Sequence, residues 1–332
     1  MVTAITPRGL RKVLVVLAGL SFALALTACG GGDDTPAVTP TVEGEATPTE
    51  ESAAADDTVQ IDQSYWHAGF KVSLSEATLT DGDVGSPTVT IDATFENLGN
   101  TDATPDSQLA LTSGANSYSS GSLEEDIPRV PAGLSSTGTI AFDVDEDFTF
   151  DDATLIVGNP QNNQAFVPLG PDGDELVSLL PREIPATGTV AAGAVTAHVT
   201  GAELRADLPN QHSEMEAGKL ALTVRFDIDV GSGIQIGQGV FQGPNVALIL
   251  PDGTAVAVRS DGVSGVNELL QGKEGTTISD LAVRFEVDEP SEGTYAFVVR
   301  GAYGPGGTDV EGQVTIQIPP ATTGGAAANA TP

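Results

Sequence analysis

The alternation of apolar and polar residues constrains the fold of this chain more than any other feature. Val89, Ile91, Ala93 and Phe95 are separated by polar residues, and a longer run of the same kind covers 220–230. Apolar residues at every second position place one face of a strand against a core and the other face in water. The pattern therefore predicts an all-β chain with mostly antiparallel sheets.

Turn signals separate these runs, and helical signals are scarce. Turns are indicated at Asp81-Gly82, at Asp252-Gly253 and at 304–307, where Gly, Pro and Asp gather. A composition that would support one or two turns of helix occurs at Asp174 to Leu180 and at Val266 to Leu270. Apolar residues make up 40% of the chain, which is enough to bury the cores of two domains of immunoglobulin size.

The chain also contains an internal repeat. Apolar positions recur with the same spacing: Phe70, Val72, Leu74, Ala77 and Leu79 match Val195, Ala197, Val199, Ala202 and Leu204, and Ala153, Leu155 and Val157 match Tyr295, Phe297 and Val299. Residues 89–95 match 220–226, and the acidic segment 140–146 matches 283–289. Alternating strands often match by chance. The acidic segment is therefore the stronger sign of a repeat, because it has the same position relative to the other matched segments in both halves.

This repeat predicts two tandem immunoglobulin-like antiparallel β-sandwich domains, at 58–183 and 184–320, joined near 181–185. Each half has room for about seven strands, the number found in such a sandwich. A single large jelly roll is the alternative. The low-complexity residues 321–332 are expected to form a disordered tail.

The first 28 residues have the layout of a cleaved signal peptide. Arg8, Arg11 and Lys12 precede the uncharged run 13–26, and small residues come after that run. The run is too short to cross a hydrocarbon core, which needs about 20 apolar residues. We therefore expect residues 1–28 to be removed from the mature chain.

The only cysteine of the chain, Cys29, stands directly after this segment. The order Leu26-Thr27-Ala28-Cys29-Gly30 resembles the lipobox of bacterial lipoproteins. The resemblance implies cleavage before Cys29 and a diacylglycerol on its thiol, whose two acyl chains anchor the protein on the extracytoplasmic face of the cell membrane. The alternative is a free cysteine without a lipid, or one that awaits an intermolecular partner.

Residues 29–57 are expected to comprise the lipidated cysteine and a disordered tether, because the segment is acidic and rich in Thr and Pro. The lipobox, this tether, "YWHAGFKVSLSEATL" at 65–79 and "GTIAFDVDEDFTFDDATLIVG" at 138–158 resemble actinobacterial lipoproteins with immunoglobulin-like domains, akin to a secreted mycobacterial antigen family. The resemblance implies a fold and an envelope location. It assigns no functional residue.

The charge of the chain limits its partners. Its formal net charge is −33, which repels phosphate backbones and anionic lipid headgroups and argues against nucleic-acid binding. Cations, basic protein surfaces of the envelope and neutral glycans remain as partner classes. An acidic surface that serves only solubility is the simpler interpretation.

The candidate metal site is an acidic run at the end of a predicted strand. Hard cations such as Ca²⁺ bind six to eight oxygens, and crowded carboxylates can supply several of them. The run lacks the glycine and terminal glutamate of an EF-hand loop, and a solvated turn is the alternative. The residues concerned are Asp143, Asp145 and Asp147, with Glu146, Asp151 and Asp152 close by.

The segment Tyr65-Trp66-His67 contains the only tryptophan. One interpretation is an exposed aromatic platform for a glycan, or a histidine ligand for a metal. The other is that Trp66 fills the sandwich core while His67 lies at its edge, and this core arrangement is the one we expect. His198 and His212 do not have metal-ligand spacing with each other or with His67.

No familiar catalytic motif is present, so we expect a non-catalytic protein without a cofactor, Ca²⁺ excepted. The glycines of 233–243 do not have phosphate-loop spacing and suit a hairpin or bulge. The predicted function is a lipid-anchored binding or interaction module of the cell envelope, with recognition in end loops such as 113–122 or 231–243. A lipoprotein that captures a small ligand or a cation for transport or sensing is the alternative, and a hydrolase of envelope polymers is a third.

Overall fold

The computed structural model describes residues 57–80, 86–105, 108–234, 240–259, 267–289 and 293–320. This part of the chain is all-β with several antiparallel sheets, which confirms the predicted fold class at that level. Its helices are three short 3₁₀ turns, η1 (Pro209–Gln211), η2 (Gly243–Asn245) and η3 (Pro305–Gly307). The predicted signal peptide, Cys29, the tether through residue 56 and the tail lie outside the described residues.

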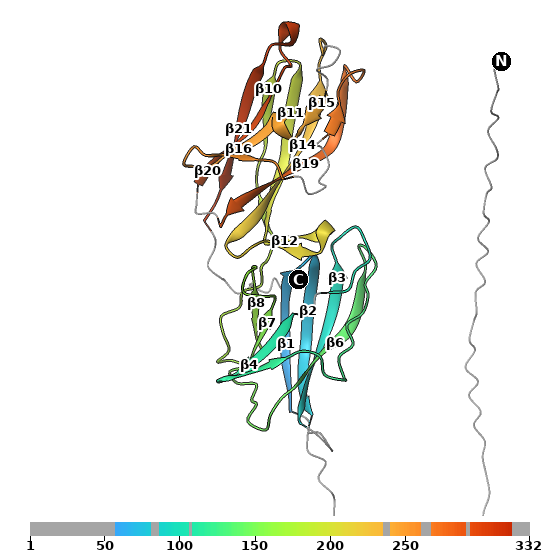
Figure 1. Ribbon diagram of the computed structural model, residues 1–332, viewed down its shortest axis with the longest axis vertical. Coiled ribbons are helices and arrows are strands. Elements are labelled where there is room, and N and C mark those ends of the chain that lie inside the picture. The colour runs from blue at the N-terminus through green and yellow to red at the C-terminus, as the bar shows by residue number, and fades with distance from the viewer. Residues whose placement is uncertain are drawn as a thin grey trace, which may run out of the picture. The chain divides into compact units, whose positions relative to one another are not determined.

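The N-terminal region, drawn in blue to green in Figure 1, consists of two four-stranded sheets. The first has the order β1 (Asp57–His67), β2 (Phe70–Thr80), β3 (Thr88–Asn97) and β6 (Ser135–Asp143). The second has the order β5 (Asn116–Ser119), β4 (Leu109–Ser113), β7 (Thr154–Val157) and β8 (Ala165–Pro168). Their apolar faces share one buried core.

The C-terminal region has the same strand order (Figure 1). Its first sheet contains β10 (Gly188–Ala192), β11 (Val195–Arg205), β14 (Lys219–Val230) and β19 (Thr276–Asp288), and β9 (Arg182–Ile184) also pairs with β11. Its second sheet contains β17 (Ala255–Ala257), β16 (Val246–Ile249), β20 (Gly293–Gly301) and β21 (Val310–Ile318). Two small ladders are added, β12 (Asp207–Leu208) with β13 (Ser213–Glu214), and β15 (Val240–Gln242) with β18 (Asn267–Leu269).

The two regions also share an irregularity at matching positions. The step from Leu74 to Ala77 on β2 faces a shorter step on β3, and the step from Val199 to Ala202 on β11 faces a shorter step on β14. An extra residue on one strand of an antiparallel pair is a β-bulge. Where the alternation of apolar and polar residues shifts by one position, the bulge lets the following apolar side chains still face the core. The three-residue gap in the repeated apolar spacing is therefore the trace of a bulge.

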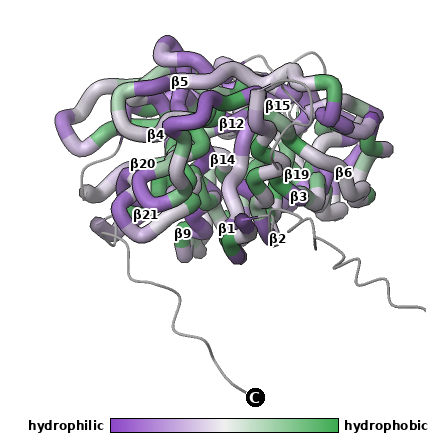
Figure 2. Tube along the Cα trace, turned by 90° about the horizontal axis from the view of Figure 1, so that it is seen from below, coloured by the Kyte–Doolittle hydropathy of each residue, from purple (hydrophilic) through white to green (hydrophobic). Residues whose placement is uncertain are grey.

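Aromatic side chains fill the middle of the C-terminal core. The ring of Phe297 lies 5.5 Å from that of Phe226 and 6.3 Å from that of Phe285, and all three residues are fully buried. Figure 2 shows how apolar and polar stretches alternate along the chain, as expected of strands with one face on a core.

Both expected helical segments are wrong. Residues 174–180 form no helix, and Val177 exchanges backbone hydrogen bonds of 2.9 and 3.0 Å with Phe166. In the second segment Asn267–Leu269 forms β18, while residue 266 lies outside the described residues. Isolated helices of one or two turns are unstable, whereas pairing with an existing strand satisfies the same backbone groups at once.

The expected arrangement of Trp66 and His67 is also wrong. Tyr65 lies in the N-terminal core, Trp66 is half-buried with the Lys71 ammonium 5.7 Å from its ring, and His67 is buried. Successive side chains of a strand point to opposite faces, so a core position for Tyr65 places Trp66 on the outer face.

Candidate functional site

Two candidate sites in the described structure bring polar side chains together, one in buried surroundings and one in a hollow with mostly apolar walls. One, which we call the junction, is where the hairpin β12–β13 meets the turn between β1 and β2. The other, which we call the pocket, is a hollow of the C-terminal region beside β16 and β17.

The junction arises from a connection that is longer in the second half. Between β2 and β3 the chain has seven residues, 81–87, whereas between β11 and β14 it has thirteen, 206–218. This longer connection forms β12, η1 and β13, and Leu208, Met215 and Ala221 form a small apolar cluster there. Gly69 is required where the hairpin meets the β1–β2 turn, because a Cβ there would lie 2.7 Å from the Pro209 carbonyl oxygen.

The centre of the junction is a buried pair of titratable side chains. His67 Nδ1 lies 3.0 Å from Glu214 Oε1, and the two side chains are 5% and 3% exposed. The backbone N–H of Ala68 donates to the same carboxylate oxygen. Burial raises the pKa of Glu214 above its usual value, although the hydrogen bonds and charge of His67 and the Ala68 N–H act in the opposite direction.

A second carboxylate supports the same turn. Asp207 Oδ2 accepts a hydrogen bond of 2.8 Å from the backbone N–H of Gly69. Arg205 Nε donates to Asp207 Oδ1 at 2.7 Å, and Arg205 Nη1 donates to Glu203 at 3.2 Å. Asp207 is thus buried with an arginine as its counter-ion, which offsets the cost of removing its charge from water.

Asn163 makes a further set of contacts between the two regions. Its Nδ2 donates to the carbonyl oxygen of Lys219 at 2.8 Å, and its Oδ1 accepts from the N–H of Gly218 at 3.1 Å. Its backbone N–H donates to the carbonyl oxygen of Met215 at 3.1 Å. The junction is therefore held by directional hydrogen bonds as well as by apolar contact.

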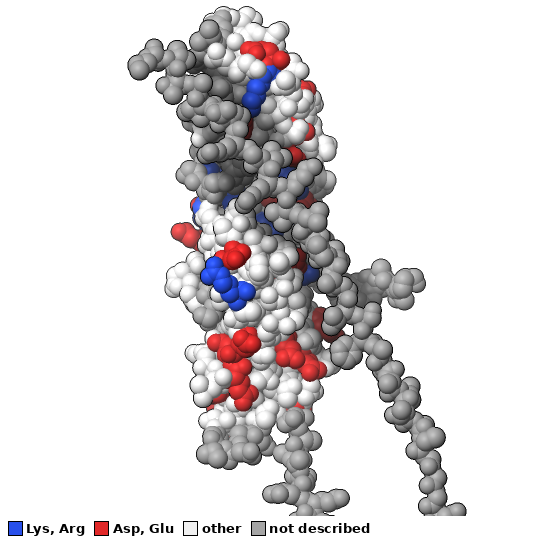
Figure 3. Space-filling model, turned by 90° about the vertical axis from the view of Figure 1, so that its right-hand side faces the viewer, with Lys and Arg blue, Asp and Glu red and all other residues white. Residues whose placement is uncertain are grey.

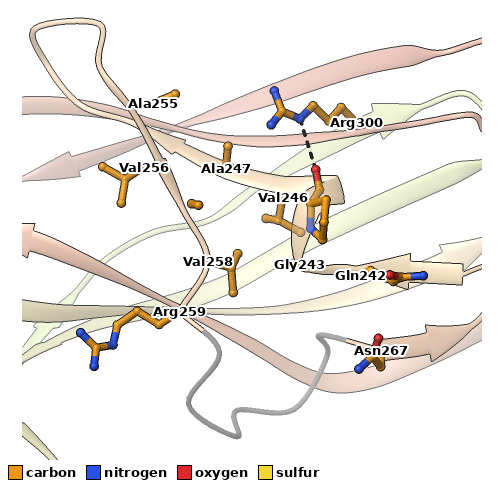
Figure 4. Close-up of a pocket in the computed structure, with 12 residues that line it drawn as sticks. Gln242, Gly243, Val246, Ala247, Ala255, Val256, Val258, Arg259, Asn267 and Arg300 are labelled. Atoms are coloured by element: carbon orange, nitrogen blue, oxygen red, sulfur yellow. Dashed lines mark hydrogen bonds between the residues drawn. The ribbon is translucent and has the colours of Figure 1, made fainter.

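The pocket, about 520 Å³ in volume, lies in the C-terminal region (Figure 4). Small apolar side chains of β16, β17 and the residue after β17 form much of its wall, and two arginines, two amide side chains and the turn η2 complete it. The lining residues are Gln242, Gly243, Pro244, Val246, Ala247, Ala255, Val256, Ala257, Val258, Arg259, Asn267 and Arg300. A volume of this size, with mostly apolar walls and a few polar groups, is typical of small-molecule sites.

The two arginines differ in their partners. Arg300 Nε donates to the carbonyl oxygen of Pro244 at 3.3 Å, and among the described residues Arg300 forms no ion pair. Arg259 Nη1 is paired with Glu286, and Figure 4 shows its side chain running away from the other lining residues. Arg300 is therefore the cationic group best placed to meet a ligand.

The predicted calcium residues lie on an exposed turn at the end of β6. Asp145 accepts hydrogen bonds from Tyr118 Oη at 2.8 Å and from Asn116 Nδ2 at 3.1 Å, and the backbone N–H of Asp147 also donates to it at 3.2 Å. Asp143 ends the strand as an exposed residue. Among the described residues, no group of three or more His, Cys, Asp or Glu side chains is arranged to hold a metal ion. Calcium binding at Asp143, Asp145 and Asp147 therefore stays a prediction that no cluster of ligands in the described structure supports.

The sequence pointed to one edge of the pocket and missed the rest. The expected recognition loop 231–243 ends at Gln242 and Gly243, which line the pocket, whereas residues 235–239 of that loop lie outside the described residues. The apolar run 255–258 before Arg259 was an available signal, because the matching strand of the first half is polar. The junction had a weaker signal, the extra length of 206–218.

The described part of the chain defines an all-β protein of sandwich-like architecture with a surface pocket. In this part no helix is long and apolar enough to span a membrane. No protein-family model matches the chain, and no curated protein does. One solved structure, described as the crystal structure of the conserved domain protein from Bacillus anthracis, is 10% identical, with 83% of this chain and 96% of that chain covered and a TM-score of 0.24. That TM-score is too low to indicate a shared fold.

Proposed function

We propose that this protein is a lipid-anchored, extracytoplasmic, non-catalytic binding protein of the cell envelope, which captures a small ligand in the pocket of its C-terminal region. The pocket is the observation that carries the proposal, because it joins a volume suited to a small molecule with mostly apolar walls and a few polar groups. Capture of a small ligand is favoured over capture of a cation because, among the described residues, no carboxylate lines the pocket.

We further propose that the body is a pair of tandem immunoglobulin-like sandwiches. Support comes from the identical strand order of the two regions, from the two separate buried cores and from the bulge at matching positions. A rigid double scaffold of this kind presents its recognition surfaces on loops and short edge strands.

The membrane anchor rests on the sequence around Cys29 and has its own test. Cells that express the full chain are labelled with a fatty-acid analogue, and the protein is then separated by fractionation. The native chain should carry the label and remain with the membrane, whereas a Cys29→Ser variant should lose the label. A Cys29→Ser variant that is labelled and fractionates as before would contradict the anchor.

Ligand capture is tested separately by a thermal-shift screen of small metabolites against the full chain in lipid nanodiscs. A ligand of the pocket should raise the midpoint of unfolding, because binding to the native state stabilises it. The shift should disappear in an Ala257→Leu variant, in which a larger side chain enters the pocket from an exposed position of β17. A shift that persists in this variant would place the ligand elsewhere.

A further inference from the structure

The pocket has a charge character opposite to that of the chain. Acidic residues number 46 and basic residues 13, yet the described residues of the pocket wall include two arginines and no Asp or Glu. A hollow whose described lining is basic and not acidic favours an anionic group over a cation or a neutral polar group. Charge complementarity therefore narrows the class of ligand that the proposed binding function requires.

The matching positions of the first half lack this character. The pairing of β5 with β4, compared with that of β17 with β16, aligns Ser117-Tyr118-Ser119 with Ala255-Val256-Ala257. When the sequence is counted on from these strands, Gly121 and Gly158 correspond to Arg259 and Arg300 of the second half. The apolar wall and both arginines are thus additions of the second half to a shared framework.

The donors of Arg300 are available to a ligand. Its side chain is exposed, its Nε bonds to the Pro244 carbonyl, and within the described structure no carboxylate forms an ion pair with it. A guanidinium binds a carboxylate through two parallel N–H donors, here those of Nη1 and Nη2. Figure 4 shows this side chain extending along one rim of the pocket, across from Val256 and Val258.

The surroundings limit the charge of the ligand. Arg300 also lines a neighbouring hollow that contains Asp309 and Glu311, and Arg259 is already neutralised by Glu286. A ligand with several negative charges would be repelled by these carboxylates and by the net charge of the chain. The ligand is therefore expected to carry one negative charge, which the single available guanidinium of Arg300 can balance.

We infer that the pocket binds a small monocarboxylate with an apolar body, whose carboxylate pairs with Arg300 and whose body lies against the valines and alanines of β16 and β17. This inference rests on the proposed function, because it names the class of ligand for the same pocket. Burial of the apolar body supplies affinity at roughly 25 cal/mol per Å². The guanidinium supplies the preference for an acid over its neutral analogue.

The test compares octanoate with two matched probes, the neutral octanamide and the cationic octylammonium. The full chain is held in nanodiscs, binding is measured by calorimetry, and the signal of empty nanodiscs is subtracted. Octanoate should bind about tenfold more tightly than octanamide, the size of one charge-assisted contact at an exposed site. Octylammonium should bind more weakly than both.

Variants locate the contacts. Arg300→Gln should weaken octanoate about tenfold, to the level of octanamide, and leave octanamide unchanged. Ala257→Leu should abolish the binding of both probes. Ser119→Leu, the matching change on β5 of the first half, should leave both affinities as they are.

The outcomes separate the ligand class from the binding function. Equal affinity for octanoate and octanamide, unaffected by Arg300→Gln, would overturn the monocarboxylate and leave a ligand pocket in place. Tighter binding of octylammonium would do the same. Failure of all three probes to bind, or equal loss of binding in Ser119→Leu and Ala257→Leu, would overturn the assignment of this pocket as a ligand site.

Discussion

The N-terminal and C-terminal regions share a framework but differ in what they add to it. Their sheets have the same strand order and the same bulge, yet residues 58–180 contain 20 acidic and two basic residues, while 181–320 contain 18 acidic and eight basic residues. Figure 3 shows, on one face, groups of acidic side chains and fewer basic ones. The difference between the halves is thus mainly one of basic residues, and those of the second half include Arg259 and Arg300 at the pocket and Arg205 at the junction.

The hollows of the two regions differ in the same way. A hollow of about 420 Å³ in the first region lies over β3 and β6 and is lined mostly by polar residues, including Asp92 and Asp126. The pocket of the second region is lined by valines, alanines and two arginines. The comparison teaches that the sheets and cores maintain the fold, while edge strands and connections are free to diverge toward function.

The largest effect is expected from matched core truncations. Phe95 and Phe226 are equivalent in the repeat and fully buried, so Phe95→Ala and Phe226→Ala should each lower the free energy of unfolding by about 3–5 kcal/mol. Trp66, the only tryptophan, reports on the first region by its fluorescence in urea. If the junction couples the regions, Phe226→Ala should also shift the Trp66 transition. An unmoved Trp66 transition would show that the regions unfold separately.

The next effect concerns the junction. Glu214→Ala removes the acceptor of the Ala68 N–H and the partner of buried His67, and should lower the free energy of unfolding by about 3 kcal/mol. Thermal and chemical unfolding measure the change. Glu216→Ala, which removes an exposed carboxylate of the same connection, is the control and should be nearly neutral. Equal effects of the two variants would contradict the role of the buried pair.

A smaller effect is expected at the second contact of the junction. Asn163→Ala removes the hydrogen bonds of its side chain to Lys219 and Gly218, and should cost about 1–2 kcal/mol of unfolding free energy. Asn162→Ala changes a neighbour whose backbone pairs with Glu216, and should have little effect. Denaturant midpoints compare the two variants. A larger loss of unfolding free energy in Asn162→Ala than in Asn163→Ala would contradict the stabilising role of the Asn163 side chain.

The smallest effect is a change of slope with pH. Because the pKa of Glu214 is raised in the folded state, the native chain holds its proton at a pH where the unfolded chain has lost it. This carboxyl therefore contributes stability below its unfolded pKa and loses that contribution as the pH rises through the folded pKa. His67, which pairs with Glu214, and Asp207, whose charge acts on it, are the titratable groups around it, and Asp207 is itself paired with Arg205.

Glu214→Gln keeps the shape of the side chain and removes its titration. The free energy of unfolding should then fall less steeply as the pH rises above about 4.5, the ordinary glutamate pKa. Urea unfolding at a series of pH values measures the slope. Identical slopes for Glu214→Gln and the native chain would show that Glu214 titrates alike in the folded and unfolded states.

Much of the fold could be predicted because strand formation has a local signature. The apolar spacing of Val89 to Phe95 and of 220–230 marks β3 and β14, and the gap between Leu74 and Ala77 marks a bulge. The prediction of a helix was wrong at Val177, where a short segment pairs with a neighbouring strand. The prediction of a core position was wrong for Trp66, because Tyr65 faces the core instead. In both cases the result depends on how the strands pair and pack, which the local pattern does not contain.

The candidate site was the least predictable part. Ala68 and Glu214 are 146 positions apart, and no local pattern indicates that they meet. The pocket is bounded by β16, β17 and the two residues after it, η2, and one residue each of β15, β18 and β20, so its walls come from segments that are separate in the sequence. Comparison of the two halves of the repeat nevertheless indicates part of the pocket, because residues 255–258 are apolar and are followed by Arg259, whereas the matching strand of the first half is polar.

By itself the sequence determined that the chain forms strands, that they recur in two sets, and that the surface is strongly acidic. These properties arise from residue periodicity and charge, which act over short stretches or over the whole chain. The tertiary structure alone decided that Glu214 meets His67 and that Arg300 borders an apolar hollow. Such contacts depend on which distant segments pack together and on where their side chains leave space, and neither is set by neighbours in the sequence.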